Sequence, residues 1–503
     1  MLSIVSAAVV VGVQGVPVSV EVHVSNGLPG FTVVGLPDTA CREARDRVRA
    51  ALLSSELRWP AARVTVNLAP SDLRKTGSGL DLAIAVGLAA ASEQVPLGSL
   101  EGRGFLGELG LDGQIRNVPG LLPMVAACSA RDVVVPSAAG SGVAAAPRRT
   151  ARPVAHLTDL IAILRNERPM PEPPELAIDL HHHRGPDLAD VAGQSLGRLA
   201  VEVAAAGGHH LLLMGPPGAG KTMLAKRVRG LLPPLTDQEA LEVSMVHSAA
   251  GLALPQDGLI RTPPQRAPHH GVSAVGLVGG GSSRLRPGEA SLAHRGVLFL
   301  DELGEFAPHV LEMLRQPLEE GAIRVVRATG AATFPARFLL VAAMNPCPCG
   351  EAARPNVCRC TDGERARYGR RLSGPLLDRF DLRIMVDRPS SDVVLSAARS
   401  ESTAAVADRV AAARARAMTR GIATNSAIDT ADLDELAPLS HEALQLLTLA
   451  LDNGALSPRG AHRLRRVALT LADINHEDGP LSGQRIAEAL AMRAEPARLL
   501  GLV

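Results

Sequence analysis

The chain has 503 residues, of which 46% are hydrophobic and 20% charged, and its formal net charge at pH 7 is +1. The apolar content excludes a chain that is disordered throughout, and the length predicts about three domains. The near-neutral total excludes a general electrostatic attraction to nucleic acids or membranes, so any nucleic-acid surface must be a local patch.

Cysteine usage and hydropathy indicate a cytoplasmic protein with no membrane partner. Six cysteines are too few for a disulfide scaffold, which favours a reducing compartment. The apolar N-terminus lacks a preceding basic segment, so we do not expect a signal peptide. No uncharged apolar run reaches the roughly 18 residues that a membrane-spanning helix needs.

Residues 1–165 combine strand and helix patterns and are predicted to form an α+β domain. Residues 16–24 alternate apolar and polar side chains, and residues 64–68 indicate another strand. Asp38 can cap a helix, and residues 80–91 have the composition of a buried helix. The apolar face of the helix after Asp38 comprises Ala40, Ala44, Val48 and Leu52.

Residues 166–186 are predicted to be an extended linker, because prolines cluster there and hydrophobic periodicity is weak. The run His181 to His183 can bind a metal or belong to a solvated loop. Three adjacent side chains cannot all point one way in a strand or helix, so we favour the loop. Beyond the linker, residues 187–390 alternate strands with helices, which predicts a parallel α/β sheet. Residues 391–503 have helical spacing and are predicted to form a separate helical subdomain.

The strongest motif in the chain is a phosphate loop. An apolar strand at 211–214 runs into GPPGAGKT at 215–222, and a helical stretch follows. In this pattern, backbone N–H groups and the helix N-terminus face phosphate oxygens, Lys221 reaches the β- and γ-phosphates, and the Thr222 hydroxyl binds Mg²⁺. A chance glycine-rich turn is the alternative, but the flanking strand and helix argue against it. The predicted nucleotide-binding residues are Gly215, Pro216, Pro217, Gly218, Ala219, Gly220, Lys221 and Thr222, together with Asp301.

Two later strand ends complete a site for ATP hydrolysis. The apolar strand at 297–300 ends in Asp301 and Glu302. Asp301 is predicted to hold Mg²⁺, and Glu302 is placed to polarise an attacking water as general base. A third strand, at 338–343, leads to Asn345, which can position the water or sense the γ-phosphate. The alternative for Asn345 is that it only begins a turn before a proline.

Four cysteines form a candidate metal site. Cys347, Cys349, Cys358 and Cys360 make two C-x-C pairs, and four thiolates are enough for a tetrahedral structural Zn²⁺. The pairs are tighter than the usual zinc spacing, so a metal-free loop stays open as an alternative. A disulfide pair is disfavoured in the cytoplasm. Cys41 and Cys128 are expected to be small core residues.

These motifs, in this order, resemble those of the AAA+ ATPases. More narrowly, the chain resembles the magnesium-chelatase-like family of the YifB/ComM type. The resemblance implies an α/β AAA+ P-loop core with a parallel sheet and a C-terminal helical lid. It also implies a preceding α+β N-terminal domain of the Lon-protease-like (ribosomal S5 domain 2) type. The runs that carry it are GLPGFTVVGLPD (27–38), VTVNLAPSDLRKTGSGLDLAIAVG (64–87), APHHGVSAVGLVGGG (267–281), RPGEASLAHRGVLFLDELGEF (286–306) and FPARFLLVAAMNPCPCG (334–350).

The resemblance implies roles for Asn345 and for two further residues. Asn345 is similar to the family's sensor-1 residue. Arg379, in GPLLDRFD, resembles an arginine finger that acts on the nucleotide of the next subunit, although a local salt bridge is an alternative. Arg459, in LSPRGAHRL, resembles the sensor-2 arginine of the lid, although it can simply be a residue at a helix start.

The N-terminal domain is expected to lack peptidase activity. In the Lon resemblance, Gly79 stands where the proteases carry their serine, and no lysine occurs near Leu122, where their lysine falls. A Ser–Lys dyad needs a desolvated amine beside the hydroxyl. The remaining alternative is a displaced dyad of Ser78 and Lys75, the latter one of only three lysines in the chain.

The segment 321–338 predicts a β-hairpin between the acid-tipped strand and the sensor strand. In ring ATPases of this branch such a hairpin projects into the central pore, where Arg324 and Arg327 would contact DNA phosphates in a salt-sensitive way. For a second arginine group we favour a solvated face over DNA contact; it comprises Arg365, Arg367, Arg370 and Arg371. The insertion that carries His269 and His270 can serve pore contacts or subunit packing.

Two classes of function compete. The resemblance implies a homo-oligomeric, hexameric DNA helicase of the ComM type, which acts on single-stranded or branched DNA in recombination or transformation. The alternative is a chelatase-type remodelling subunit that drives metal insertion through partner proteins. We prefer the DNA motor, because no porphyrin or metal-donor site is identified in the sequence.

Overall fold

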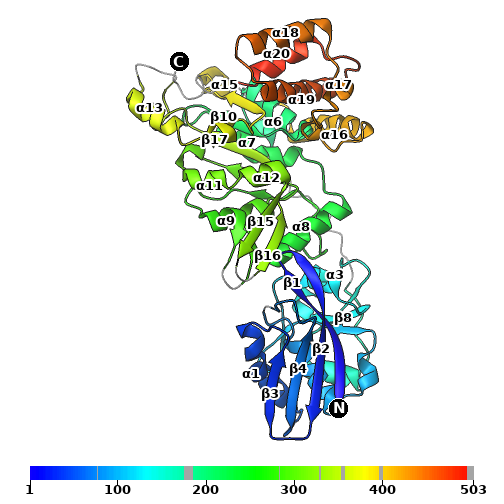
Figure 1. Ribbon diagram of the computed structural model, residues 1–503. Coiled ribbons are helices and arrows are strands. Elements are labelled where there is room, and N and C mark those ends of the chain that lie inside the picture. Colours follow the sequence, from blue (N-terminus) through cyan, green and yellow to red (C-terminus); the bar gives the residue numbers. More distant parts are fainter. Residues whose placement is uncertain are drawn as a thin grey trace.

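The computed structural model describes residues 1–75, 77–174, 185–281, 284–327, 330–352, 357–395 and 400–494. Three parts follow one another along the chain (Figure 1). A mixed sheet formed by the N-terminal strands lies at one end, a parallel sheet lies in the middle, and a group of helices lies at the other end. The run His181 to His183 lies outside the described residues.

The N-terminal sheet has seven strands in the order β3-β4-β2-β1-β5-β8-β9. β1 and β2 form a long antiparallel hairpin, β2 also pairs antiparallel with β4, and the remaining pairs are parallel. The predicted strands at 16–24 and 64–68 lie in β2 and β4. The strands are β1 (Leu2–Val11), β2 (Gln14–Ser25), β3 (Gly30–Val34), β4 (Arg63–Ala69), β5 (Arg103–Phe105), β8 (Asp132–Pro136) and β9 (Thr150–Val154), with the small pair β6 (Glu108–Leu109) and β7 (Ile115–Arg116).

Of the helices in this part, α1 and α2 are the two that the sequence predicts. The Asp38 carboxylate accepts a hydrogen bond from the backbone N–H of Cys41 at 2.8 Å, so α1 begins directly after it. Every residue of α2 is buried. Cys41 and Cys128 are both buried core residues. The helices are α1 (Thr39–Ser54), α2 (Asp81–Ala91), α3 (Leu121–Ala127), α4 (Gly140–Val143) and α5 (Leu157–Leu164), with 3₁₀ turns at Leu97–Leu100 and Ser137–Ala139.

The middle sheet is wholly parallel, in the order β11-β14-β17-β10-β18. Its strands alternate between two cores. Leu212 and Met214 of β10 face the core that continues into the N-terminal part, whereas Leu211 and Leu213 face the core shared with the C-terminal helices. Both faces are therefore covered, as expected of a parallel sheet. The strands are β10 (Leu211–Met214), β11 (Gln265–Arg266), β14 (Val297–Leu300), β17 (Leu339–Met344) and β18 (Leu382–Met385).

The remaining elements of the middle part surround this sheet. The predicted hairpin is present as β15 and β16, which pair antiparallel with Ile323 opposite Phe334. The helices are α6 (Ser195–Gly207), α7 (Lys221–Leu231), α8 (Asp237–Ala250), α9 (Ala274–Val278), α10 (Glu289–Leu292), α11 (Pro308–Glu312), α12 (Arg315–Glu320), α13 (Asp362–Gly369) and α14 (Gly374–Leu377), with 3₁₀ turns at Leu188–Asp190 and Leu303–Glu305. The strands are β12 (Gly279–Gly280), β13 (Arg286–Pro287), β15 (Ala322–Arg327) and β16 (Gly330–Pro335).

The C-terminal part is helical and is organised around a buried carboxylate. Asp473 of α19 is 1% exposed and accepts hydrogen bonds from Arg416, Arg420 and Asn425. The helices are α15 (Ser391–Leu395), α16 (Thr403–Thr419), α17 (Leu433–Leu436), α18 (His441–Asp452), α19 (Pro458–Ile474) and α20 (Gly483–Ala491), with a 3₁₀ turn at Asn425–Ala427. Among the described residues, no helix has the length and apolar character to cross a membrane.

The N-terminal and middle parts contact each other through α3 and α8. The backbone N–H of Gly120 donates to the carbonyl of Ser248 at 2.7 Å, and that of Leu122 donates to the Ser248 hydroxyl at 3.2 Å. The turn between β1 and β2 also reaches β16, where a side chain at Gly12 would meet Ala332 Cβ at 2.9 Å. The hairpin of β15 and β16 therefore packs against the N-terminal part.

Candidate functional site

Three motifs that are far apart in the sequence meet at one edge of the middle sheet. The phosphate loop follows β10, Asp301 and Glu302 follow β14, and Asn345 follows β17. These strands are neighbours in the order β14-β17-β10 and run parallel, so their carboxyl ends lie together. Parallel sheets bind ligands at this edge.

The phosphate loop has the backbone geometry that its glycines predict. Gly218 and Gly220 have φ angles of 76° and 91°, and a side chain added at either would meet nothing within 4 Å. Gly215 is packed instead, because an added Cβ would lie 2.0 Å from the carbonyl oxygen of Val386. The loop thus turns beside β18, leaves open space in front of its glycines and leads into the N-terminus of α7. This geometry fits a nucleotide phosphate.

Lys221 and Asn345 contact each other across the site. The Lys221 ammonium donates to the carbonyl oxygens of Gly215 at 2.6 Å and Pro216 at 2.9 Å, and to Asn345 Oδ1 at 3.1 Å. Burial lowers the pKa of Lys221, while the nearby Asp301 carboxylate opposes that shift. The contact joins the phosphate loop to the tip of the neighbouring strand, as expected for groups that share one ligand.

The two predicted magnesium ligands are also adjacent. Thr222 Oγ1 donates to Asp301 Oδ2 at 3.0 Å. A hydroxyl and a carboxylate oxygen are hard ligands of the kind that Mg²⁺ prefers, so the residues present fit this ion.

Glu302 has a partner that sequence reasoning did not assign. Its carboxylate oxygen lies 3.1 Å from Nδ1 of His270, whose ring contacts that of His269 with centroids 3.9 Å apart and ring planes tilted by 37°. Glu302 itself has a φ of 53°, so its backbone is left-handed where the strand ends. His270 lies a few residues after β11, the strand beside β14. Its short sequence distance from that strand was the signal that could have identified it.

The two predicted arginines of the hydrolysis site lie elsewhere. Arg379 precedes β18, which pairs with β10 from Leu382 opposite Leu211 to Met385 opposite Met214. Arg379 therefore lies at the amino edge of the sheet, and the phosphate loop lies at the carboxyl edge. Its guanidinium is paired with Glu319 of α12. Burial lowers the pKa of Arg379, and the neighbouring Arg463, Arg315 and Arg459 lower it further.

The C-terminal helices hold the Arg379 segment in place. Arg463 of α19 donates to the carbonyl oxygen of Arg379 at 3.0 Å and to Asp381 Oδ1 at 2.8 Å. Arg459 is exposed at the start of the same helix. The structure thus groups Arg459 with Arg379 at the amino edge of the sheet.

The hairpin presents its predicted arginines to solvent. Arg324 and Arg327 are exposed, whereas the neighbouring Ile323 and Val325 are buried. In the second arginine group, Arg367 and Arg370 are exposed. Arg365 forms an ion pair with Asp362. Arg371 donates a hydrogen bond to the carbonyl oxygen of Gly304, close in sequence to Asp301 and Glu302.

The N-terminal part shows where the Lon-type catalytic positions fall. A side chain at Gly79 would meet Met124 Cε at 2.9 Å, and Leu122 is fully buried against α8. Ser78 Oγ donates to Glu108, while the buried Lys75 ammonium donates to the carbonyl oxygen of Pro70. The displaced pair is therefore directed to two different partners.

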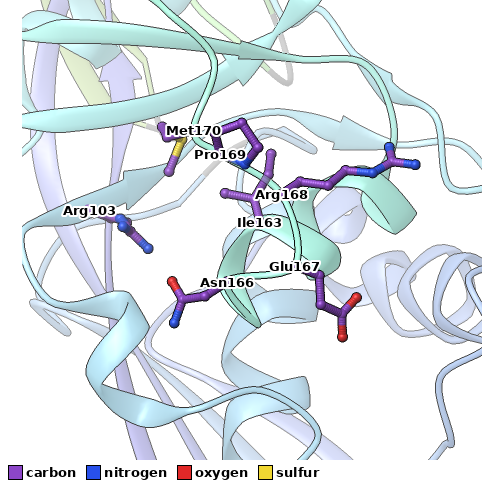
Figure 2. A pocket seen from close by; sticks show the side chains of 7 residues that line it. All are labelled: Arg103, Ile163, Asn166, Glu167, Arg168, Pro169 and Met170. Carbon is purple, nitrogen blue, oxygen red and sulfur yellow. The ribbon is translucent and has the colours of Figure 1, made fainter.

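The hollow in Figure 2 lies away from all these groups. It is lined by Arg103 of β5 and by residues at and after the end of α5, and none of the predicted site residues lines it. We assign no function to it.

A parallel sheet with a phosphate loop, an acid-tipped strand and a polar strand tip at one edge defines a P-loop nucleotide-binding protein of the AAA+ class. Comparisons with known proteins narrow the class. Families described as subunit ChlI of Mg-chelatase, magnesium chelatase subunit ChlI, and the ChlI C-terminal part match residues 20–139, 187–394 and 400–493.

Relatives that match this chain over almost their full length support the same family. An uncharacterized protein of Mycobacterium tuberculosis is 46% identical over 97% of both chains. YifB of Salmonella typhimurium is 43% identical over 100% of this chain and 99% of its own, and the competence protein ComM of Haemophilus influenzae is 41% identical over 98% and 97%. The chain therefore belongs to the magnesium-chelatase-like family of AAA+ ATPases. Two shorter matches are to Lon protease 2 of Bacillus subtilis, 31% identical over 27% of this chain and 26% of its own, and to the probable DNA helicase MCM9 of Arabidopsis thaliana, 25% identical over 38% and 25%.

Proposed function

We propose that this protein is an ATP-hydrolysing ring motor that moves on DNA, assembled from identical subunits and most simply a hexamer. The observation that carries the ring is the position of Arg379, at the sheet edge opposite its own phosphate loop. A repeated head-to-tail contact would bring this edge of one subunit to the nucleotide of the next, and such contacts close into rings.

Within one subunit, the carboxyl edge of the sheet supplies the groups for hydrolysis. Lys221 and the backbone N–H groups of the loop hold the β- and γ-phosphates. Thr222 and Asp301 hold Mg²⁺, which when bound neutralises charge on the phosphates. Glu302 takes the proton of the attacking water as general base, and Asn345 orients that water or contacts the γ-phosphate.

The neighbouring subunit supplies the missing positive charge. Arg379 acts as the arginine finger on the developing charge of the transferred phosphoryl group. Arg459, close enough to affect the pKa of Arg379, acts as the sensor-2 arginine from the same side. Both arginines therefore contact the nucleotide that is bound by the adjacent subunit.

We propose that DNA is the polymer along which the motor moves. We also propose that the protein acts in the cytoplasm. In the hairpin of β15 and β16, Ile323 and Val325 are buried, Arg324 is exposed on the opposite face, and Arg327 is exposed at the end of β15. Exposed arginines on a supported hairpin suit sequence-independent binding of a phosphate backbone. The names of two relatives, a competence protein and a probable DNA helicase, point the same way. A role in branch migration during recombination or transformation follows from this assignment.

For the domains, we propose residues 1–165 as a Lon-like domain without a catalytic dyad, 166–186 as a linker, 187–390 as the ATPase core and 391–503 as the lid. The separate partners of Ser78 and Lys75, and the burial of Leu122 against α8, support the loss of peptidase chemistry. A Ser–Lys dyad needs its amine beside its hydroxyl.

The second candidate is a chelatase-type remodelling ATPase, favoured by the family descriptions that match the chain. The two candidates differ in what stimulates hydrolysis. The ATPase rate is measured with and without single-stranded, duplex and branched DNA. A DNA motor is stimulated by at least one of them, and absence of both stimulation and binding at low salt favours the remodelling subunit.

Charge reversal at the hairpin sharpens this test. Arg327→Glu is expected to weaken DNA binding with unchanged basal ATPase. The DNA affinity of this variant should also depend less on salt than that of the wild type. In a plot of log affinity against log salt concentration, the slope should become less negative by about 0.9 for each phosphate that is no longer neutralised. Arg45→Glu makes the same charge change on the exposed side of α1 and serves as control. Equal DNA affinity of Arg327→Glu and Arg45→Glu would show that the hairpin does not contact DNA.

A further inference from the structure

The four clustered cysteines have the geometry of a single-metal site. The Sγ atoms of Cys347, Cys349 and Cys358 lie 3.4, 3.6 and 3.9 Å apart, and all four sulfurs lie within 4.8 Å of one another. A tetrahedral ion with Zn–S bonds of about 2.3 Å requires sulfurs about 3.8 Å apart. Four sulfurs at this spacing surround one ion and leave no room for a multi-iron cluster.

The segment that carries these cysteines touches three parts of the nucleotide site. First, Cys347 follows Asn345 by two residues at the end of β17. Asn345 is bonded to Lys221, so the first sulfur is two residues from the contact that joins two strand tips.

Second, the segment packs on the phosphate loop. A side chain at Gly350 would lie 2.4 Å from Pro217 Cδ, so the backbone there rests directly against the loop. Arg388 links the same two pieces, because it donates to the Pro217 carbonyl oxygen at 2.9 Å and to Glu351 Oε1 at 2.6 Å.

Third, the helix that follows the last cysteine covers the acid-tipped strand end. Tyr368 of α13 packs against Gly304, where an added Cβ would lie 2.5 Å from the ring. Arg371 donates to the Gly304 carbonyl oxygen at 2.6 Å. Gly304 is two residues after Glu302, so this contact supports the proposed general base.

We propose that Cys347, Cys349, Cys358 and Cys360 bind one Zn²⁺ that braces the nucleotide site, by joining the segments that carry Asn345, Pro217 and Gly304. Zinc suits the role because four thiolates in a tetrahedron favour it and it has no redox chemistry of its own. The zinc site stands on the cysteine geometry alone, whereas the bracing role rests on the proposed ATP site.

The first experiment measures metal content of the full-length protein purified without chelators. Elemental analysis should find about one zinc per chain in the wild type and in Cys128→Ala, whose sulfur is buried in the N-terminal core. Cys358→Ala should contain almost none. Less than about a tenth of an equivalent of zinc in the wild type, or iron in its place, would overturn the zinc assignment.

The second experiment measures affinity for a fluorescent ATP analogue. Removing zinc from wild-type protein with a chelator should weaken binding about tenfold, and adding zinc should restore it. Gly350→Ala keeps all four thiolates but places a methyl group against Pro217 and a non-glycine residue at a φ of 82°. It should retain zinc and still bind the analogue more weakly. Gly421→Ala is the matched control, because Gly421 has a similar left-handed φ of 77° and an added Cβ there meets nothing within 4 Å.

The outcomes separate the two proposals. Zinc-loaded and zinc-free protein with equal nucleotide affinity would overturn the bracing role, even if zinc is present. Wild-type protein that holds zinc but binds no nucleotide would overturn the proposed ATPase and the brace, and would leave the zinc site standing. Circular dichroism of each sample shows that a loss of affinity does not come from unfolding.

Discussion

Arg379 makes the sharpest test of the ring, because its position in the sheet dictates which nucleotide it can reach. Strands rise about 3.3 Å per residue, so the paired register places the level of Leu382 about 13 Å from Gly215 along the strand axis. Arg379 lies three residues further back, beyond Leu382. Arg379→Ala should therefore leave nucleotide affinity unchanged and lower the ATPase rate by about 10³-fold or more, the usual contribution of an arginine finger.

Mixing two inactive variants distinguishes action on a neighbour from action within one subunit. Lys221→Ala destroys its own phosphate loop but keeps Arg379, whereas Arg379→Ala keeps the loop. In a ring assembled at random from equal amounts, about a quarter of the subunit contacts pair an intact loop with an intact finger. The mixture should then hydrolyse ATP at about a quarter of the wild-type rate if the sites act independently.

The assay is steady-state phosphate release, with each variant alone as control and the order of mixing varied. Normal hydrolysis by Arg379→Ala alone would show that it is not the finger. Two inactive variants that stay inactive after co-assembly, confirmed by sedimentation, would show that the arginine does not act across the subunit boundary.

The other predictions concern the general base, its partner and the lid. Glu302→Gln should bind ATP with unchanged affinity and turn it over about 10²-fold more slowly, because the amide cannot take the proton; wild-type turnover would exclude Glu302 as the base. His270→Ala should lower kcat about threefold to tenfold without changing nucleotide affinity, since Glu302 loses the ring that orients it, and failure of His270→Gln to recover part of the rate would argue against a hydrogen-bonding role. Asp473→Ala should lower the free energy of unfolding by about 3 kcal/mol in urea titrations followed by circular dichroism, because the half-buried Arg416 and Arg420 lose the carboxylate that they share. The exposed Asp452→Ala is its control, and a similar small loss in both variants would refute that account.

Local sequence patterns predicted much of the fold and of the nucleotide site. The strand at 16–24, the capped helix after Asp38, the hairpin at 321–338 and the phosphate loop are all present. Each depends on residues close together in the chain, such as alternating side chains, an N-cap oxygen or glycines with positive φ. Physical rules of short range therefore suffice for these elements.

Local sequence patterns could not predict the contacts between segments that are far apart in the chain. The ring of His270 beside Glu302 depends on β11 pairing with β14, and the packing of Gly350 on Pro217 depends on β17 lying beside β10. Lys75, one of only three lysines in the chain, lies buried with its ammonium donating to the backbone carbonyl oxygen of Pro70. Nothing in the local pattern around these residues specifies their partners.

The amino-acid sequence alone specifies which groups this protein has for ATP chemistry, because phosphate, magnesium and proton transfer each require particular side chains at fixed short spacings. Which of these groups act together depends on the tertiary structure. Strand order brings Lys221, Asp301 and Asn345 to one edge of the sheet, and strand direction places Arg379 at the other. The physical reason is that strand order and direction are set by packing of whole elements, so one set of motifs is divided between a site within the subunit and a surface at the opposite edge.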